Sequence, residues 1–142
     1  MAISQAVCNS FKKELLDGAH DFDTGGSTFK LAMYTSAANL SAATTTYTTT
    51  SEVGASGAYA AGGGVLQSQQ TSVASGVAIV DFANLSFTGV TITARGALIY
   101  NSNANKQAVA VLDFGSDKTA TSGTFTIQFP AYTTAAAILR IS

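Results

Sequence analysis

The sequence changes its hydrophobic period once, shortly after residue 20, and this change limits the fold more than any other feature. Residues 3–17 place apolar side chains at every fourth position, which is the spacing of one face of an α-helix. From residue 28 onward, segments of alternating apolar and polar residues appear, as in strands with one buried face. We therefore predict a single domain over residues 1–142, with a helix within residues 1–20 and a β-sandwich over residues 28–142.

The apolar stripe of the predicted helix is formed by Ile3, Val7, Cys8, Phe11, Leu15 and Leu16. Ser4 is placed to cap the start of this helix, because its hydroxyl can accept a hydrogen bond from a free amide of the first turn. Gly18 is placed to end it in the left-handed conformation that glycine adopts without strain. The single cysteine, Cys8, has no partner for an intramolecular disulfide, which favours folding in a reducing cytoplasm.

The sequence pattern of the remaining chain predicts many short strands separated by turns. One-sided alternation marks residues 29–34, 90–95 and 124–129, and apolar runs that suit inner strands cover residues 77–82, 98–100, 108–114 and 135–141. Gly-, Ser-, Asn- and Asp-rich breaks fall at residues 23–27, 62–64, 101–105 and 115–117. About eight or nine short strands with regular turns predict a mainly β, jelly-roll-like antiparallel β-sandwich with one N-terminal α-helix.

The amino-acid composition indicates what kind of partner such a domain binds. Only 11% of the residues are charged, whereas soluble domains have about 25%, and the formal net charge is -1. A protein that binds nucleic acid is expected to be basic, so we expect no nucleic acid partner. No apolar stretch reaches the roughly 20 residues of a membrane helix, and the N-terminus lacks the pattern of a signal peptide, so we expect no membrane partner. A surface so poor in charge is typical of a structural subunit that contacts other subunits.

Candidate catalytic and metal-binding residues are few. The string Asp23-Thr24-Gly25 matches the aspartic-protease triplet, but that chemistry needs two carboxylates that share a proton, and a turn explains the string more simply. His20, Asp21 and Asp23 are a weak metal-binding set, because a second cluster of ligands is missing. We interpret these residues as belonging to a surface loop.

Other reactive combinations are also weak. Asp81 and Asp113 end apolar runs, where carboxylates usually accept hydrogen bonds from backbone amides. A Cys8–His20 dyad would join opposite ends of the predicted helix, and residues 62–64 lack the strand and helix of a phosphate-binding loop. We therefore predict a protein that is not an enzyme and that has no catalytic residue, no cofactor and no metal ion.

The segment Thr44–Thr50, with the sequence Thr-Thr-Thr-Tyr-Thr-Thr-Thr, favours extended backbone because threonine is branched at Cβ. Two interpretations remain open for it. It is either an ordinary surface strand, or an extended arm that adds β structure to a neighbouring molecule. In the second case the residues at a protein interface would be Thr44, Thr46, Tyr47, Thr48 and Thr50.

Five strings of the sequence together resemble the small virion proteins of tailed bacteriophages. They are residues 29–36, 47–53, 59–63, 93–97 and 112–116, with the sequences FKLAMYTS, YTTTSEV, YAAGG, TARGA and LDFGS. Within that group the chain most resembles the capsid cement, or decoration, proteins of the type carried by the Bordetella phage. The resemblance extends over most of the chain from residue 29 to residue 141.

This resemblance implies a jelly-roll protein that sits on the capsid exterior of the virion, is made in the host cytoplasm, and clamps neighbouring subunits of the major capsid protein. It implies no cofactor and no reaction. We also expect self-association as a dimer or trimer. Two alternative functions are a tail- or fibre-associated virion component and a carbohydrate-binding β-sandwich module.

Overall fold

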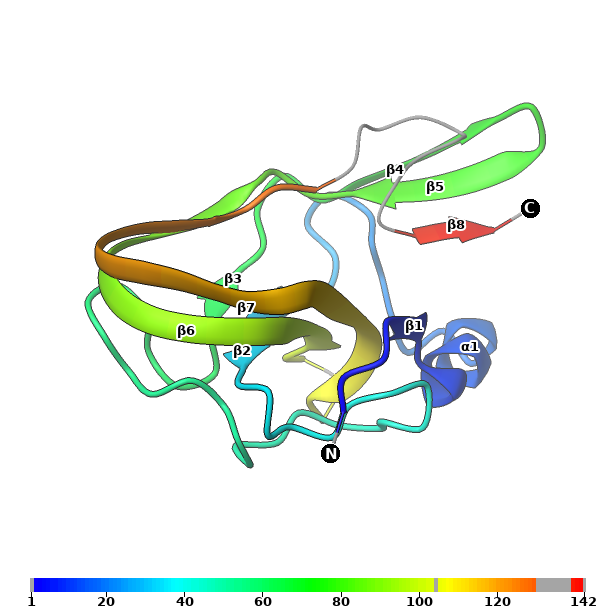
Figure 1. Ribbon diagram of the computed structural model, residues 1–142. Coiled ribbons are helices and arrows are strands. Elements are labelled where there is room, and N and C mark those ends of the chain that lie inside the picture. Colours follow the sequence, from blue (N-terminus) through cyan, green and yellow to red (C-terminus); the bar gives the residue numbers. More distant parts are fainter. Residues whose placement is uncertain (1, 104, 130–138, 142) are drawn as a thin grey trace.

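The computed structural model describes residues 2–103, 105–129 and 139–141, and it is mainly β (Figure 1). In these residues the chain forms eight strands and one helix. The elements are β1 (Ala6–Val7), α1 (Asn9–Leu16), β2 (Phe29–Tyr34), β3 (Gly64–Val65), β4 (Gln70–Ala74), β5 (Val77–Asp81), β6 (Leu85–Asn101), β7 (Gln107–Ile127) and β8 (Leu139–Ile141).

The strands form two antiparallel sheets. The larger has the order β1-β7-β6-β2-β3 and the smaller the order β4-β5-β8. The larger sheet and the connections around it make up the body of the molecule, and the smaller sheet extends from one end of it (Figure 1). The prediction of a mainly β, antiparallel fold with one N-terminal helix is confirmed, and the arrangement is consistent with a β-sandwich. These strand orders do not by themselves establish a jelly-roll connectivity.

Two strands are much longer than the sequence pattern predicted. β6 has 17 residues and β7 has 21, and they pair along most of their length. The segments that we expected to be separate short strands are parts of these two, and the strands curve back on themselves at one edge (Figure 1). Irregularities in the register, one of them next to Gly89 with φ of 62°, allow the bend without ending the pairing.

The predicted break at residues 115–117 is wrong for a specific reason. Asp113 pairs with Gly96 and Lys118 pairs with Ala94, so residues 114–117 of β7 lie opposite the single residue Arg95 of β6. The turn-forming residues therefore produce a large bulge inside one strand. Gly115 has φ of 83°, and its amide donates a hydrogen bond to Asp113 Oδ1, as in a local turn.

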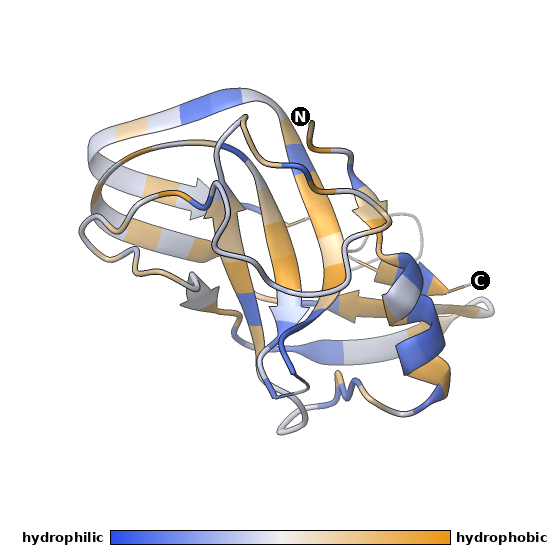
Figure 2. Ribbon diagram, turned by 90° about the horizontal axis from the view of Figure 1, so that it is seen from below, coloured by the Kyte–Doolittle hydropathy of each residue, from blue (hydrophilic) through white to orange (hydrophobic). Residues whose placement is uncertain are grey.

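The core lies between the central strands, the helix and the connecting loops. β2 is buried on both faces, because Ala32 and Tyr34 are as inaccessible as Leu31 and Met33, and the one-sided pattern predicted for it is wrong. In residues 90–95 of β6 the predicted alternation is confirmed. Apolar residues are concentrated on the central strands (Figure 2). An aromatic cluster closes one end of the core, with the rings of Phe22 and Phe29 stacked at 4.3 Å between centroids.

The N-terminal helix is shorter than predicted, because several of the residues before it make β pairings with other segments. Ala6 and Val7 pair with β7, and Ile3 bridges Leu40 in parallel orientation. The helix begins after Cys8, which makes no side-chain capping bond, so Ser4 is not the cap. Apolar residues at every fourth position do not distinguish a helix from a segment whose backbone forms hydrogen bonds with a neighbouring strand. Leu16 is also outside the predicted stripe, since it is 90% exposed.

The end of the helix follows the prediction. Gly18 has φ of 76°, its amide donates to the carbonyl of Leu15, and the amide of Ala19 donates to the carbonyl of Glu14. This pair of hydrogen bonds satisfies carbonyl groups that the helix leaves free at its C-terminus. The strand predicted at residues 135–141 is observed as β8 over its last three residues, and residues 135–138 lie outside the described residues.

We expect Gly18→Ala to lower the free energy of unfolding by about 1 kcal/mol, because a Cβ atom is strained in the left-handed region. No heavy atom lies within 4 Å of the position that this Cβ would occupy, so the cost comes from the backbone alone. Gly54 is the matched control, since its surroundings are equally open and its φ lies outside the left-handed region. Gly54→Ala should leave stability unchanged or raise it slightly. Chemical denaturation of both variants measures the difference, and equal stabilities would contradict the prediction.

Candidate interface

The Thr loop, which we define as residues 44–50, is not a strand. It makes one isolated antiparallel bridge, between Thr46 and Gln107. Around this bridge the amide of Tyr47 donates to the carbonyl of Lys106, and the amide of Ala108 donates to the carbonyl of Thr45. The Thr loop therefore lies along the start of β7 of its own molecule, and the prediction of a surface strand is wrong. The alternative, an arm that adds β structure to a neighbouring molecule, stays a prediction.

A carboxylate beneath the loop explains why it is held in place. Glu52 accepts three hydrogen bonds, from the hydroxyl of Tyr47 at 2.5 Å, the hydroxyl of Tyr59 at 2.7 Å and the amide of Gly62 at 2.8 Å. The hydroxyl of Tyr59 also accepts a hydrogen bond from the amide of Met33 in β2. One side chain thus connects the Thr loop, the glycine-rich turn and the central sheet.

Two further tyrosines complete this arrangement. Tyr34 donates to the carbonyl of Thr48 at 2.6 Å, and Tyr100 donates to the carbonyl of Gly62 at 2.6 Å. The rings of Tyr47 and Tyr100 are stacked, with centroids 4.8 Å apart. We call Glu52 with its surrounding tyrosines the Tyr–Glu52 cluster, whose members are Tyr34, Tyr47, Glu52, Tyr59 and Tyr100. The cluster fixes the loop to the body from below.

The tyrosines of this cluster remain protonated at neutral pH. Burial is the largest cause that raises the pKa of Tyr34, Tyr59 and Tyr100, the last to about 12, and the nearby charge of Glu52 acts in the same direction. For Tyr47 the pKa is raised by burial first and then by its hydrogen bond to Glu52. Each phenol is therefore a stable donor to the acceptor that it contacts.

The structure divides the five residues predicted at the interface into two groups. Thr44, Tyr47 and Thr48 have internal roles, because Thr44 Oγ1 accepts from the amide of Ser41, Tyr47 belongs to the cluster, and Thr48 contacts Tyr34. Thr46 and Thr50 are exposed, and neither side chain takes part in a hydrogen bond within the described part of the chain. These two threonines, together with exposed Thr45 and Thr49, are the part of the loop that another molecule could contact.

Sequence reasoning missed Glu52 and the tyrosines around it. A usable signal was present, since Glu52 is the only acidic residue between Asp23 and Asp81 and it lies between Tyr47 and Tyr59. The glycine run that follows also has a structural reason. Gly63 has φ of 82°, and a Cβ atom there would lie 1.8 Å from the carbonyl oxygen of Leu31. Only glycine allows this turn to approach β2 so closely.

The exposed side of the β6–β7 pair carries neutral hydroxyl groups. Ser86 and Thr126 form a cross-strand hydrogen bond at 2.9 Å, and Thr93 and Thr119 form another at 3.0 Å. All four residues are exposed. Cross-strand threonine and serine pairs stabilise a sheet without placing charges on its surface. This surface has the same neutral character as the Thr loop.

A shallow cavity of about 570 Å³ lies along β7. Among the described residues its apolar lining consists of Leu112, Phe114, Phe125, Ile127 and Phe129, and its polar lining includes Gln5, Asp113 and Lys118. The hydrogen bond from the amide of Gly115, followed by the contact with Arg95, holds the pKa of Asp113 below its usual value. Asp113 is therefore an ionised partner of Arg95 and not a proton donor. Asp81 belongs to β5 in the other sheet, and no described contact joins the two carboxylates.

The Asp23-Thr24-Gly25 string forms a turn, in agreement with the sequence interpretation. Asp23 is exposed, and its carboxylate accepts a hydrogen bond from the amide of Thr24 at 2.9 Å. The amide of Gly26 donates to the carbonyl of Asp23, and Gln69 donates to the same oxygen. The string has a local structural role in joining this turn to the segment before β4.

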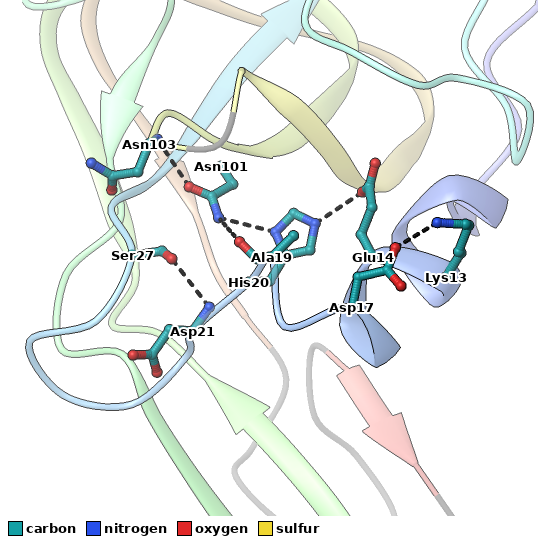
Figure 3. Close-up of polar contacts among 9 residues, drawn as sticks. All are labelled: Lys13, Glu14, Asp17, Ala19, His20, Asp21, Ser27, Asn101 and Asn103. Atoms are coloured by element: carbon teal, nitrogen blue, oxygen red, sulfur yellow. Dashed lines mark hydrogen bonds and ion pairs between the residues drawn. The ribbon is translucent and has the colours of Figure 1, made fainter.

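His20 is enclosed by hydrogen bonds that leave neither ring nitrogen open (Figure 3). Asn101 Oδ1 accepts from the amide of Asn103, which orients Asn101 Nδ2 toward His20 Nδ1 at 3.0 Å. Because an amide nitrogen only donates, Nδ1 is the acceptor, and His20 Nε2 donates to Glu14 at 2.9 Å. The histidine therefore ties the end of α1 to the end of β6.

The described residues contain neither a cluster of side chains placed to bind a metal ion nor an activated thiol. No group of three or more His, Cys, Asp or Glu side chains in this part of the chain is placed to hold a metal ion. Cys8 is fully buried, and burial, together with the charge of Glu14, raises the pKa of its thiol to about 11. The thiol is therefore protonated at neutral pH and is not an activated nucleophile.

Comparison of the chain with protein-family models, with curated proteins and with solved structures gives no match. Within the described residues no helix is long and apolar enough to cross a membrane. The features that bear on function are therefore those of the molecule itself, above all an anchored loop with exposed neutral side chains.

Proposed function

We propose that this protein is a bacteriophage capsid decoration protein, which binds the outside of the shell and stabilises it by bridging neighbouring major capsid subunits. The observation that carries the proposal is the Thr loop, because it presents uncharged side chains on a backbone that the Tyr–Glu52 cluster holds rigidly. The likeness of the sequence to cement proteins supports the same assignment. The proposal includes no reaction and no cofactor.

The physical chemistry of the Thr loop suits this task. A loop that is already ordered loses little conformational entropy on binding, so more of the contact energy stabilises the complex. Contacts between neutral groups also avoid the desolvation of ions, which often offsets the gain from a buried ion pair. Many copies arranged on one shell then add their individual contributions, since each subunit bound at two points dissociates more slowly.

Attachment to the capsid should resist moderate salt. Screening weakens exposed ion pairs, but it has little effect on neutral and apolar contacts. The test is co-sedimentation of the purified protein with capsids that lack it, over a series of NaCl concentrations. Retention across the series is expected, and release at modest salt would contradict a neutral interface.

The double variant Thr46→Asp, Thr50→Asp should weaken capsid binding by at least about tenfold, because two carboxylates would have to be desolvated at the contact. Both side chains are exposed and have no described hydrogen bond, so the variant is expected to fold normally. The matched control is Thr121→Asp, Thr124→Asp, which adds the same charges to exposed threonines of β7. Binding by the loop variant equal to that of wild type would exclude the Thr loop from the interface, and failure of every variant and wild type to sediment with capsids would exclude the function.

A further inference from the structure

The two sheets end in four strands in the described residues, β1, β3, β4 and β8, and three of these are poor sites for adding another strand. The outer sides of β6 before Gly96 and of β7 after Val111 also lack a paired strand, but the register shifts within this pair interrupt its edges. β1 and β3 have two residues each, and β8 has three and carries the charge of Arg140. Short or charged edges are the usual means by which proteins prevent their sheets from pairing with other chains. β4 differs from the other three.

β4 is a five-residue edge without charge. Its residues are Gln-Thr-Ser-Val-Ala, all five are exposed, and its pairing with β5 uses only one side of the strand. The hairpin that joins it to β5 is tight, with φ of 52° at Ser75 and 77° at Gly76, so no bulky connection covers the end of the strand. Within the described residues, no strand pairs with the outer side of β4.

One face of the smaller sheet also has an exposed apolar row that begins at this edge. Val73 pairs with Ala78, and Ala78 pairs with Ile141, so the three side chains lie on the same face. Val73 is 70% exposed and Ile141 is 59% exposed. A second row on the same face is formed by Thr71, Val80 and Leu139, because Thr71 pairs with Val80 and Val80 pairs with Leu139. Leu139 is buried in the core.

We propose that β4 is a self-association surface, at which a second copy of this chain adds its own β4 in antiparallel orientation about a two-fold axis through Ser72. In this register Gln70 lies opposite Ala74 of the second copy, Thr71 lies opposite its Val73, and Ser72 lies opposite its own counterpart. All five residues pair, and no like charges meet. The two small sheets become one six-stranded sheet, in which the apolar row of each copy continues onto the second row of the other.

The choice of a second copy follows from the strand itself. When two copies of β4 are placed antiparallel, each residue lies opposite a residue that suits it. The polar and small residues lie opposite other polar or small residues, and the exposed valine lies opposite the methyl group of a threonine. The contact is small compared with the roughly 1,600 Å² of a standard stable interface, so the dimer is expected to be weak in dilute solution. Copies held close together would pair more readily.

The test uses the whole chain, without capsids, in sedimentation velocity over a concentration series. Wild type should shift from the 14.4 kDa monomer toward a dimer as concentration rises. Ser72→Lys should weaken the dimer by at least about tenfold, because the two ammonium groups would lie directly opposite each other. Ser72→Glu should have the same effect for the same reason. Ser72 is exposed, so neither variant should affect the fold.

An equimolar mixture of Ser72→Lys and Ser72→Glu provides the decisive measurement. If the two-fold axis passes through Ser72, opposite charges meet in the mixed dimer, and association should recover to at least the wild-type level. Thr121→Lys, on β7, is the control for added charge and should dimerise like wild type. A monomeric wild type at every concentration, undiminished dimers of either single variant, or a mixture that does not recover would each overturn the proposal. Since capsids are absent, these outcomes are independent of the proposed function.

Discussion

Raising the pH above about 10 is expected to destabilise this protein steeply and to unfold it within a few pH units. In the unfolded chain the tyrosines ionise near their ordinary pKa of 10.0, whereas in the folded protein burial raises the pKa of Tyr34, Tyr59 and Tyr100. Below pH 10 these phenols are protonated in both states, and their contribution to stability is complete. Above pH 10 only the unfolded state releases the protons, so the free energy of unfolding falls as pH rises toward the folded-state pKa values.

The expected size of this effect is large. Each buried phenol contributes about 1.4 kcal/mol for every pH unit between its two pKa values, and three such groups together contribute roughly 4 kcal/mol per unit. A domain of ordinary stability, about 5–15 kcal/mol, would then unfold within a few pH units. Tyr47 is half-buried, and we leave it out of this sum because solvent screens its interactions.

The measurement combines circular dichroism with the absorbance of ionised tyrosine during a pH titration. The two signals should change together, since the buried phenols ionise as the fold is lost. Tyr34→Phe removes one of the groups and should make the loss of stability with pH shallower by about a third. Ionisation of all tyrosines near pH 10 with the fold intact would contradict the burial of the cluster.

Glu52→Ala is expected to lower the free energy of unfolding by about 3 kcal/mol. The substitution removes the acceptor for the hydroxyls of Tyr47 and Tyr59 and for the amide of Gly62. A donor left without an acceptor in a poorly hydrated site costs about 1–3 kcal/mol. The Thr loop should also loosen, which amide exchange can detect as lost protection of Tyr47, whose amide donates to Lys106.

Two further variants test this expectation. Asp117→Ala removes an exposed carboxylate with no described hydrogen bond and should change stability by less than about 0.5 kcal/mol. Glu52→Gln keeps one acceptor oxygen and should have an intermediate effect. If Glu52→Ala is as stable as Asp117→Ala in chemical denaturation, the cluster does not hold the loop.

The positions of many strands could be predicted from the sequence because they depend on local pattern. Alternation at residues 90–95 and the two-sided apolar run at 98–100 correspond to the observed structure, and of the run predicted at 108–114 the first four residues are buried on both faces. Of the break predicted at 101–105, residue 101 ends β6, residues 102, 103 and 105 form a turn, and residue 104 lies outside the described residues. Gly18 ends the helix as predicted, since left-handed backbone is a property of the residue itself.

Features that depend on distant partners could not be predicted in this way. Whether residues 115–117 end a strand depends on Arg95, which accommodates them as a bulge, and whether Ala6 and Val7 are helical depends on the edge that β7 offers them. The Thr loop has the propensity of a strand, yet its position is decided by Glu52 and by tyrosines from three other segments.

The sequence by itself therefore determined the β class of this protein, its low content of charged residues and some of its turns, such as the one at residues 23–27, because each depends on residues close together in the chain. Only the tertiary structure decided which strands continue, which strands end the two sheets in the described residues, and which side chains of the Thr loop face outward. These depend on hydrogen bonds and packing between residues far apart in sequence, and the same local pattern is compatible with more than one such arrangement.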